Sequence, residues 1–386
     1  MKQKKVSILG STGSIGRSTL EVIEQSSSQF EVAGLAAGQN LELLKIQVEK
    51  FRPKIVSCAA KEDADVLRKD KRFQDVKFFF GIEGAEEIAR DPETDIVVSA
   101  ITGINGLRPT LAAIDEGKTI ALANKESMVA GGSLIRKRIN STKACLIPVD
   151  SEHSGVFQCL AKENRDYVNK VVLTASGGPF FKTPKERMNT ISMEDVLSHP
   201  RWKMGKKVTV DSATLMNKGL ELIEARWFFD LDPSQLDMII HPQSIVHCLV
   251  EMQDGSVLAQ LSQTDMKIPI HYALTYPERG DGLLPPLDLV SVGALEFFEV
   301  DLDKFPLARL AIQVLKEKES CSVAMNAANE EAVSAFLQKK IKFLDIAVVV
   351  MTAVEQHEQK KIEIIEDIFE IDLKSREITR NLINKR

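Results

Sequence analysis

The chain has 386 residues, of which 44% are hydrophobic and 27% charged, and its formal net charge is −5 at pH 7. This length predicts two or three domains, the composition is that of a globular protein, and the mild negative charge argues against nucleic acid as the main partner. No apolar run could span a bilayer and the N-terminus has no signal or transit pattern, so we expect a cytoplasmic protein without a membrane partner. Five scattered cysteines without metal-type spacing indicate reduced thiols.

The first third of the chain alternates short apolar runs with helical patterns. The strand-like runs are Val6–Leu9, Val32–Ala36, Lys54–Cys58, Asp95–Ala100, Thr119–Leu122 and Ala144–Pro148. Strands that alternate with helices at this spacing predict a parallel, doubly wound α/β sheet of Rossmann type. We therefore expect residues 1–149 to form a nucleotide-binding domain.

A glycine-rich loop follows the first strand and precedes a helix. Gly10, Gly13 and Gly16 have the spacing G-x-x-G-x-x-G, which permits a tight turn and close approach of the backbone to a pyrophosphate. The second strand ends in Ala36-Ala37-Gly38-Gln39-Asn40, without the acidic residue that binds the ribose 2′-hydroxyl of NAD. The loop predicts a bound dinucleotide, and the missing acid favours NADP.

Two carboxylates separated by one residue, Asp150 and Glu152, follow the last strand of this pattern. In an extended segment both would point to the same side, and Glu221 is a third carboxylate further along the chain. Three such groups are hard oxygen ligands suited to Mg²⁺ or Mn²⁺. An isolated pair of this kind is more often a loop or helix-cap feature, but its position at a domain junction favours a small-molecule site.

Residues 150–276 change in character, which predicts an α+β domain with a partly antiparallel sheet. Asp254-Gly255 between two apolar runs predicts a β-hairpin, and Ser176-Gly177-Gly178 exposes backbone N–H groups suited to an oxyanion. Ser212–Phe229 is expected to be one helix on which Asn217, Lys218 and Glu221 share a face. Spacing alone is equally consistent with a solvated polar face, and it does not distinguish Glu221 from Glu224.

The last part of the chain is expected to be helical. We predict a linker over residues 277–305 and a C-terminal helical domain over residues 306–386, because Leu307–Leu315, Ala327–Leu337 and Ile346–Glu355 have the apolar period of amphipathic helices.

Long sequence blocks then resemble one enzyme family, the 1-deoxy-D-xylulose 5-phosphate reductoisomerases. They are GSTGSIG at 10–16, LANKES at 122–127, VDSEH at 149–153, SGGPF at 176–180, HPRWKMG at 199–205, VDSATLMNKGLELIEARWFF at 210–229 and HPQSIVH at 241–247. The resemblance implies an enzyme of non-mevalonate isoprenoid biosynthesis that converts 1-deoxy-D-xylulose 5-phosphate to 2-C-methyl-D-erythritol 4-phosphate. It also implies NADPH, Mg²⁺ or Mn²⁺ (with Co²⁺ as a further candidate) and a homodimer, for which strands around Ile245–Leu261 are candidate interface material.

The resemblance assigns roles residue by residue. It implies metal ligands at Asp150, Glu152 and Glu221, which selects Glu221 over Glu224, and catalytic roles for these three, Lys125 and His199. Implied substrate-binding residues are Ser151, Glu152, Ser176, His199, Trp202, Ser212, Asn217, Lys218 and Glu221, with a lid near residues 177–207. Implied cofactor-binding residues are Ser11, Thr12, Gly13, Ser14, Ile15, Gly38, Gln39, Asn40, Asn124, Lys125, Glu126, Met204 and Gly205. The family often has a basic residue in place of Gln39, so contact with the 2′-phosphate is expected to be weaker here.

Two other hypotheses fit parts of the sequence. A simpler NADP-dependent reductase, of the semialdehyde dehydrogenase or dihydrodipicolinate reductase type, would act without a metal, and the first type needs a nucleophilic cysteine with a nearby base. Cys159 follows the carboxylate pair but has no obvious base. An NADP-sensing regulator would bind the cofactor without turnover, and the density of polar motifs argues against it.

Overall fold

The computed structural model describes residues 3–198 and 205–386, so the predictions for His199, Trp202 and Met204 lie outside the described residues. Contacts within the chain divide it into two compact units. Unit 1 consists of Met1–Ser127, Ile135–Ser154 and Asp265–Pro286, and unit 2 of Met128–Leu134, Gly155–Thr264 and Leu287–Arg386. Neither unit is a single continuous stretch, because each contains segments from distant parts of the sequence.

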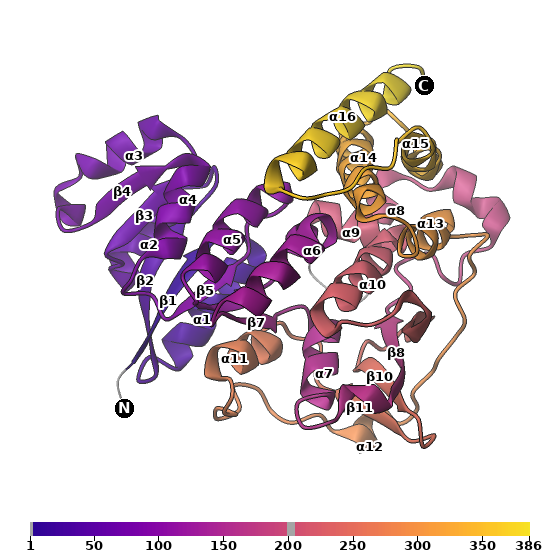
Figure 1. Cartoon of the computed structure of the whole chain (residues 1–386), viewed down its shortest axis with the longest axis horizontal. Helices are drawn as coiled ribbons and strands as arrows, with labels where there is room; N and C mark the ends of the chain where they lie inside the picture. Colours follow the sequence, from indigo (N-terminus) through magenta and orange to yellow (C-terminus); the bar gives the residue numbers. More distant parts are fainter. Residues whose placement is uncertain (1–2, 199–204) are drawn as a thin grey trace. The chain divides into compact units, whose positions relative to one another are not determined.

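Unit 1 is built on a seven-stranded sheet in which every pairing is parallel, with the order β4-β3-β2-β1-β5-β6-β7 (Figure 1). The strands are β1 (Lys4–Leu9), β2 (Phe30–Ala36), β3 (Ile55–Cys58), β4 (Lys77–Phe80), β5 (Ile96–Ser99), β6 (Thr119–Leu122) and β7 (Cys145–Pro148). The helices are α1 (Ser14–Gln25), α2 (Leu41–Phe51), α3 (Lys61–Arg68), α4 (Gly81–Arg90), α5 (Leu107–Asp115), most of α6 (Lys125–Ser141) and α11 (Lys267–Thr275). The predicted parallel, doubly wound sheet is confirmed, and β4 is a strand that the sequence reading missed.

The strand order reverses at β1, which pairs with β2 on one side and with β5 on the other. Val6, Ile8 and Val98 on these central strands are fully buried, as expected for a parallel sheet covered on both faces. In such sheets ligands bind beyond the carboxyl ends of the strands at the point of reversal. The glycine-rich loop follows β1 at this point.

Unit 2 contains a mixed four-stranded sheet with the order β11-β10-β8-β9. Its strands are β8 (Val168–Ala175), β9 (Leu236–Ile240), β10 (Val246–Met252) and β11 (Val257–Leu261). β10 is antiparallel to both β8 and β11, whereas β8 and β9 are parallel. Gly255 in the β10–β11 turn has φ +86°, a conformation that favours glycine, so the predicted hairpin and the partly antiparallel sheet are confirmed.

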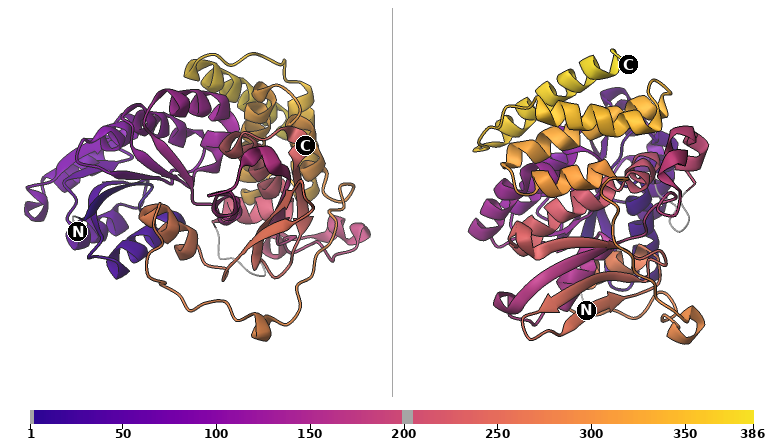
Figure 2. Two further views of the ribbon diagram at one scale, coloured as in Figure 1. Left: turned by 60° about the horizontal axis from the view of Figure 1, so that its bottom comes forward. Right: turned by 90° about the vertical axis from the view of Figure 1, so that its right-hand side faces the viewer.

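The remaining regular structure of unit 2 is mainly helical. The helices are most of α7 (Ser151–Cys159), α8 (Met193–Val196), α9 (Lys206–Ala213), α10 (Met216–Phe229), α12 (Leu289–Val292), α13 (Pro306–Val314), α14 (Glu319–Leu337), α15 (Phe343–Glu355) and α16 (Ile365–Ile383). The C-terminal helices α14, α15 and α16 pack on one another (Figure 2), which confirms the predicted helical region. The predicted helix Ala327–Leu337 is only the second half of α14. The first half contains buried polar residues, which interrupt the apolar period that marks a helix in the sequence.

Among the described residues, no helix combines the length and the apolar character needed to cross a membrane.

Candidate functional site

The glycine-rich loop of unit 1 leaves the start of α1 open to a ligand. Gly10 has φ +93°, and a Cβ there would lie 2.5 Å from the carbonyl oxygen of Ala100, so only glycine fits. Gly13 is the N-cap of α1 and provides no side-chain cap, which leaves N–H groups of the first turn available to a phosphate. Ser11 is buried and donates to Gln47 Oε1 at 2.8 Å, so this serine connects the loop to α2.

The residues after β2 form the second part of the predicted cofactor site. Gly38, Gln39 and Asn40 are exposed, and no carboxylate belongs to this segment. Asn40 Oδ1 accepts from the backbone N–H of Leu43 at 3.1 Å and caps α2. The segment therefore presents a neutral surface beside a capped helix N-terminus.

The start of α6 carries three predicted cofactor residues, Asn124, Lys125 and Glu126. Their side chains bind other residues of this segment and the end of β7. Asn124 accepts from Ser127 N at 2.8 Å as the N-cap, and its Nδ2 donates to Glu126 Oε2 at 2.9 Å. Lys125 Nζ forms an ion pair with the carboxylate of Asp150. The carboxyl end of β7 thereby carries a paired positive and negative charge.

The carboxylate pair does not lie in an extended segment, so that prediction is wrong. α7 begins at Ser151, which places Asp150 just before the helix and Glu152 in its first turn. Ser151 Oγ donates to Glu152 Oε2 at 2.6 Å, and the His153 Nδ1 atom is 3.5 Å from Asp150 Oδ2. The first turn of α7 therefore carries several polar groups.

The Gly-Gly turn of unit 2 lies against the helix that carries Ser212. Gly177 and Gly178 have φ +82° and +63°, and a Cβ on Gly178 would lie 2.6 Å from the carbonyl oxygen of Ser212. Ser176 Oγ accepts from Gly178 N at 3.2 Å. Ser176 and Ser212 are both predicted to bind the substrate phosphate, although they lie 36 positions apart in the sequence. Unit 2 brings them into one neighbourhood.

The predicted single helix over Ser212–Phe229 is two helices. α9 ends at Ala213 and α10 begins at Met216, because Leu215 has the left-handed φ of +59°. Leu215 is buried, so the surrounding core holds it in this conformation. The break places Ser212 at the end of one helix and Asn217 and Lys218 at the start of the next.

Three predicted residues of α10 form one hydrogen-bonded cluster. Asn217 Nδ2 and Lys218 Nζ each donate to a different oxygen of Glu221. The side chains of Lys218 and Glu221 are only 4% and 1% exposed, which rules out the alternative of a solvated polar face. Buried charged pairs are costly to desolvate, so they are more often kept for chemistry or specificity than for stability.

Two neighbouring helices hold this region from behind. A Cβ on Gly219 would lie 2.4 Å from Ala311 Cβ, so α10 approaches α13 as closely as a glycine allows. Asp211 of α9 is 1% exposed, forms an ion pair with Lys207 at 2.9 Å and accepts from Asn329 Nδ2 of α14 at 2.8 Å. Helices from the last quarter of the chain therefore fix the elements that carry Ser212 and Lys218.

Two sets of side chains among the described residues have the chemistry of metal ligands. One set is Asp150, Glu152 and Glu221, and the other is Asp150, His153 and Glu224. The first offers only hard carboxylate oxygens, which suit Mg²⁺ or Mn²⁺, whereas the second includes an imidazole, which suits softer transition metals. His153 was not predicted as a ligand from the sequence, and spacing left Glu224 open beside Glu221 until the family resemblance selected Glu221.

Comparison with known proteins decides the family. Family models described as 1-deoxy-D-xylulose 5-phosphate reductoisomerase, its C-terminal domain and the DXP reductoisomerase C-terminal domain match residues 6–132, 146–229 and 261–378. The reductoisomerase of Geobacter metallireducens is 49% identical over 383 residues, covering 98% of this chain and 99% of the relative. The chain belongs to the 1-deoxy-D-xylulose 5-phosphate reductoisomerase family. The Chlorobium chlorochromatii member is 46% identical over 98% of this chain and 100% of the relative.

Solved structures of the family have the same fold. A reductoisomerase in complex with NADPH, fosmidomycin and magnesium is 40% identical, with a TM-score of 0.92 over 99% of this chain and 98% of that one. The Zymomonas mobilis enzyme in complex with NADPH is 38% identical, with a TM-score of 0.92 over 99% of both chains. The predicted family, fold class and enzymatic function, a reductoisomerase acting on 1-deoxy-D-xylulose 5-phosphate, are confirmed.

Proposed function

We propose that this chain carries out the reductoisomerase reaction with a divalent cation, Mg²⁺ or Mn²⁺, bound by Asp150, Glu152 and Glu221. Support comes from the chemistry of the three side chains, which offer only carboxylate oxygens, and from relatives solved with magnesium. Asp150 and Glu221 each contact a lysine, Lys125 and Lys218, which balances their charge. A divalent cation supplies charge stabilisation for alkoxide and enolate oxygens when it is bound.

NADPH is proposed to bind unit 1 at the reversal of strand order. Its pyrophosphate would lie against Thr12 and Gly13 and meet the N–H groups of Ser14 and Ile15 at the start of α1, which no side chain caps, whereas the Gly13 N–H already donates to the Gly10 carbonyl. Its 2′-phosphate would meet Gly38, Gln39 and Asn40, where the missing carboxylate removes a charge that would repel it. The remaining proposed cofactor residues are Ser11, Asn124, Lys125, Glu126, Met204 and Gly205.

The substrate phosphate is proposed to bind unit 2 between the Gly-Gly turn and the α9–α10 break. Ser176, Ser212, Asn217 and Lys218 provide hydroxyl, amide and ammonium donors within that unit, and backbone N–H groups of the glycine turn add to them. Ser151, Glu152, His199 and Trp202 complete the proposed substrate site, the last two in a lid near residues 177–207. The buried Lys218–Glu221 pair on one turn of α10 is the observation on which the proposal chiefly rests.

These residues serve the chemistry by binding and orientation. The phosphate does not react, so its binding energy can hold the reacting carbons in place and exclude water from the aldehyde intermediate. Lys125 is expected to hold the Asp150 carboxylate in one orientation, because the two groups form an ion pair. Asn217 and Lys218 do the same for Glu221. His199 is proposed as a further catalytic residue.

We also propose a role for each part of the chain and a homodimeric assembly. Residues 1–149 would bind NADPH, and residues 150–276 would carry out catalysis and dimerisation. Residues 277–305 would connect this part to the C-terminal helical domain, residues 306–386, which would support the site. A homodimer is proposed through the β10–β11 hairpin, because β11 is an edge strand and Val257 on it is 54% exposed. Sedimentation velocity on the wild type and on Val257→Lys tests this, and an unchanged mass in the variant contradicts the interface.

The deciding experiment follows NADPH oxidation with 1-deoxy-D-xylulose 5-phosphate, with and without Mg²⁺ or Mn²⁺. Glu221→Gln and Glu224→Gln form a matched pair, because both residues are buried on α10 one turn apart. We expect Glu221→Gln to lower kcat by on the order of 10²–10³-fold with unchanged NADPH affinity, and Glu224→Gln to lower it far less. The reverse order would favour the ligand set that contains His153.

The two other sequence hypotheses are overturned by the family membership. The semialdehyde dehydrogenase type needs a reactive cysteine with a nearby base, and the hydrogen-bond partner of Cys159 is another thiol, that of Cys248. No base for it was found from the sequence, and the full-length match to reductoisomerases leaves no role for a simple reductase or a regulator without turnover.

A further inference from the structure

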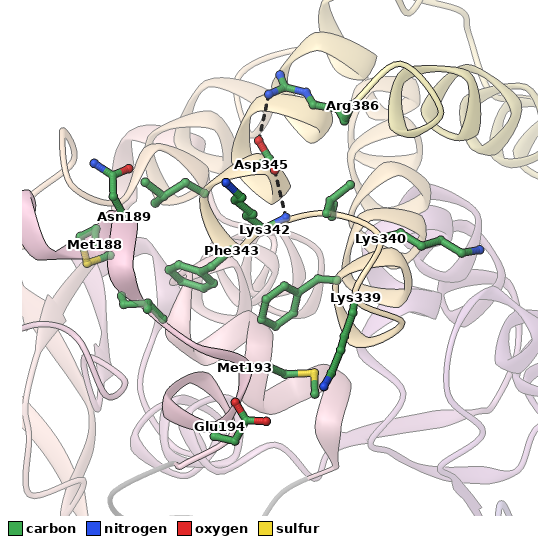
Figure 3. A pocket seen from close by; sticks show the side chains of 14 residues that line it. Met188, Asn189, Met193, Glu194, Lys339, Lys340, Lys342, Phe343, Asp345 and Arg386 are labelled. Atoms are coloured by element: carbon green, nitrogen blue, oxygen red, sulfur yellow. Dashed lines mark hydrogen bonds and ion pairs between the residues drawn. The ribbon is translucent and has the colours of Figure 1, made fainter.

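A cavity of about 600 Å³ lies within unit 2, and no residue proposed by number for the substrate, the metal or the cofactor lines it, although one wall belongs to the segment near residues 177–207 proposed as a lid. Its walls are the segment from Met188 to Glu194, which ends within α8, the turn that joins α14 to α15, and Arg386 (Figure 3). The volume is within the range of small-molecule sites in proteins. A polar sugar phosphate is a poor match for it, because much of its wall is apolar.

The floor of the cavity is apolar and held in place by ring packing. Met188, Phe336 and Phe343 lie at its base and are each at most 5% exposed, so the apolar surface open to a ligand comes from Leu344, which is 37% exposed, and from the half-buried Ile191 and Met193. The rings of Phe336 and Phe343 pack edge to face with centroids 6.1 Å apart, and Phe180 packs on the same Phe343 ring at 5.4 Å. The apolar surface is therefore preformed, so a ligand would not need to order it.

The rim of the cavity is positively charged. Lys339, Lys340 and Lys342 line it and are exposed, and none of their ammonium groups forms an ion pair or hydrogen bond with the residues that the structure describes. The carboxylate of Asp345 does not neutralise them, because it pairs with Arg386 at 2.9 Å and accepts from the backbone N–H of Lys342 (Figure 3). Glu194 is the other acidic residue of the lining, so the rim has an excess of positive charge.

One of these lysines occupies a position where glycine would be less strained. Lys339 follows α14 with a left-handed φ of +61°, and the backbone N–H groups of Lys339 and Lys340 close the end of that helix on Phe336 and Ala335. Glycine is the usual residue at this place in a helix ending. Arg52 and Asp230 end α2 and α10 in the same left-handed conformation, so the conformation of Lys339 is that of a helix ending, and it directs this lysine to the turn that lines the cavity.

We propose that this cavity binds a small amphipathic anion, with an apolar chain on Ile191, Met193 and Leu344 and a phosphate head among Lys339, Lys340 and Lys342. Three ammonium groups suit a multiply charged head, and each acts as a mobile point charge rather than as a fixed fork. Inorganic phosphate lacks the apolar chain and a neutral alkyl compound lacks the charge, so neither satisfies both parts of the cavity.

The test is calorimetric titration of the full chain with n-octyl phosphate below its micellar concentration. Inorganic phosphate and octyl glucoside serve as the half-matching probes. We expect saturable binding of n-octyl phosphate and at least tenfold weaker binding in the double variant Lys339→Gln/Lys342→Gln. Lys316→Gln is the matched control, because Lys316 is also an exposed lysine of unit 2 but does not line the cavity.

Turnover of 1-deoxy-D-xylulose 5-phosphate by the variants checks that they are folded. Equal affinity in the wild type and the double variant overturns the proposal, as does an equal loss in Lys316→Gln, which would show non-specific attraction of charge. Binding of octyl glucoside or inorganic phosphate as tight as that of n-octyl phosphate also overturns it.

Discussion

The hydrogen bond from Asn329 to Asp211 offers the sharpest test of how the C-terminal helices support the site. Asn329→Ala removes a donor to a carboxylate that is 1% exposed, and a hydrogen bond to a charged group contributes about 1.5–3 kcal/mol. Asn329 Oδ1 is buried without a partner among the described residues, so its removal returns part of this loss. We expect a net fall in the free energy of unfolding of about 1–2.5 kcal/mol.

A second background separates the charge from the packing. Asp211→Asn keeps the shape but removes the charge, so the remaining bond is neutral and contributes about 0.5–1.5 kcal/mol. Asn329→Ala should therefore cost less in the Asp211→Asn background than in the wild type. Because Asp211 adjoins Ser212, Asn329→Ala should also raise KM for 1-deoxy-D-xylulose 5-phosphate while leaving KM for NADPH unchanged.

Urea unfolding followed by circular dichroism gives the stability, and steady-state kinetics give both KM values. Equal cost of Asn329→Ala in the two backgrounds would show that the negative charge of Asp211 adds nothing to the hydrogen bond, and the reasoning would be refuted. A change in KM for NADPH of the same size would show a general loosening of the chain instead.

Three further predictions concern single residues. Lys218→Ala should raise KM for the phosphorylated substrate about 10–100-fold, since a charge-assisted hydrogen bond contributes about 1.5–3 kcal/mol; an unchanged KM in the same kinetic assay would remove Lys218 from the phosphate site. Gln39→Arg should lower KM for NADPH several-fold and leave KM for NADH unchanged, and a parallel change in both would contradict the 2′-phosphate contact. Burial lowers the pKa of His241 from 6.5, although a hydrogen bond to the Glu296 carbonyl opposes this, so the unfolded chain binds more protons and stability should fall as pH drops below about 6.5. His241→Gln should flatten that fall in urea unfolding between pH 7.5 and 5.5, and an unaltered slope would assign it to other groups.

The parallel sheet could be predicted because its strands are short, buried and regularly spaced. Lys77–Phe80 was missed since it is only four residues long, lacks an alternating apolar pattern and leads directly into α4, which begins at Gly81. The hairpin was predicted from Asp254-Gly255, whose glycine provides the positive φ that the turn needs. These features depend on local chemistry, which the sequence carries.

Other features depend on tertiary packing and could not be read in advance. The break between α9 and α10 occurs at Leu215, a residue with no turn preference, which the core holds at positive φ. α7 begins at Ser151 without a glycine or proline to mark it, so Asp150 and Glu152 looked extended. Spacing could not select Glu221 over Glu224, and only the resemblance to a family did so.

The contact between Gly219 and Ala311 has a consequence for recombining genes of this family. The two residues are far apart in the sequence, yet their Cβ positions leave no room for a larger side chain on either helix. A chimera that joins the first 300 residues of this chain to the tail of a relative will tolerate the exchange only where both parents have small residues at this crossing. For a crossover point between positions 219 and 311, the parents should therefore be chosen by the sizes of their residues at these two positions, not by their overall sequence identity.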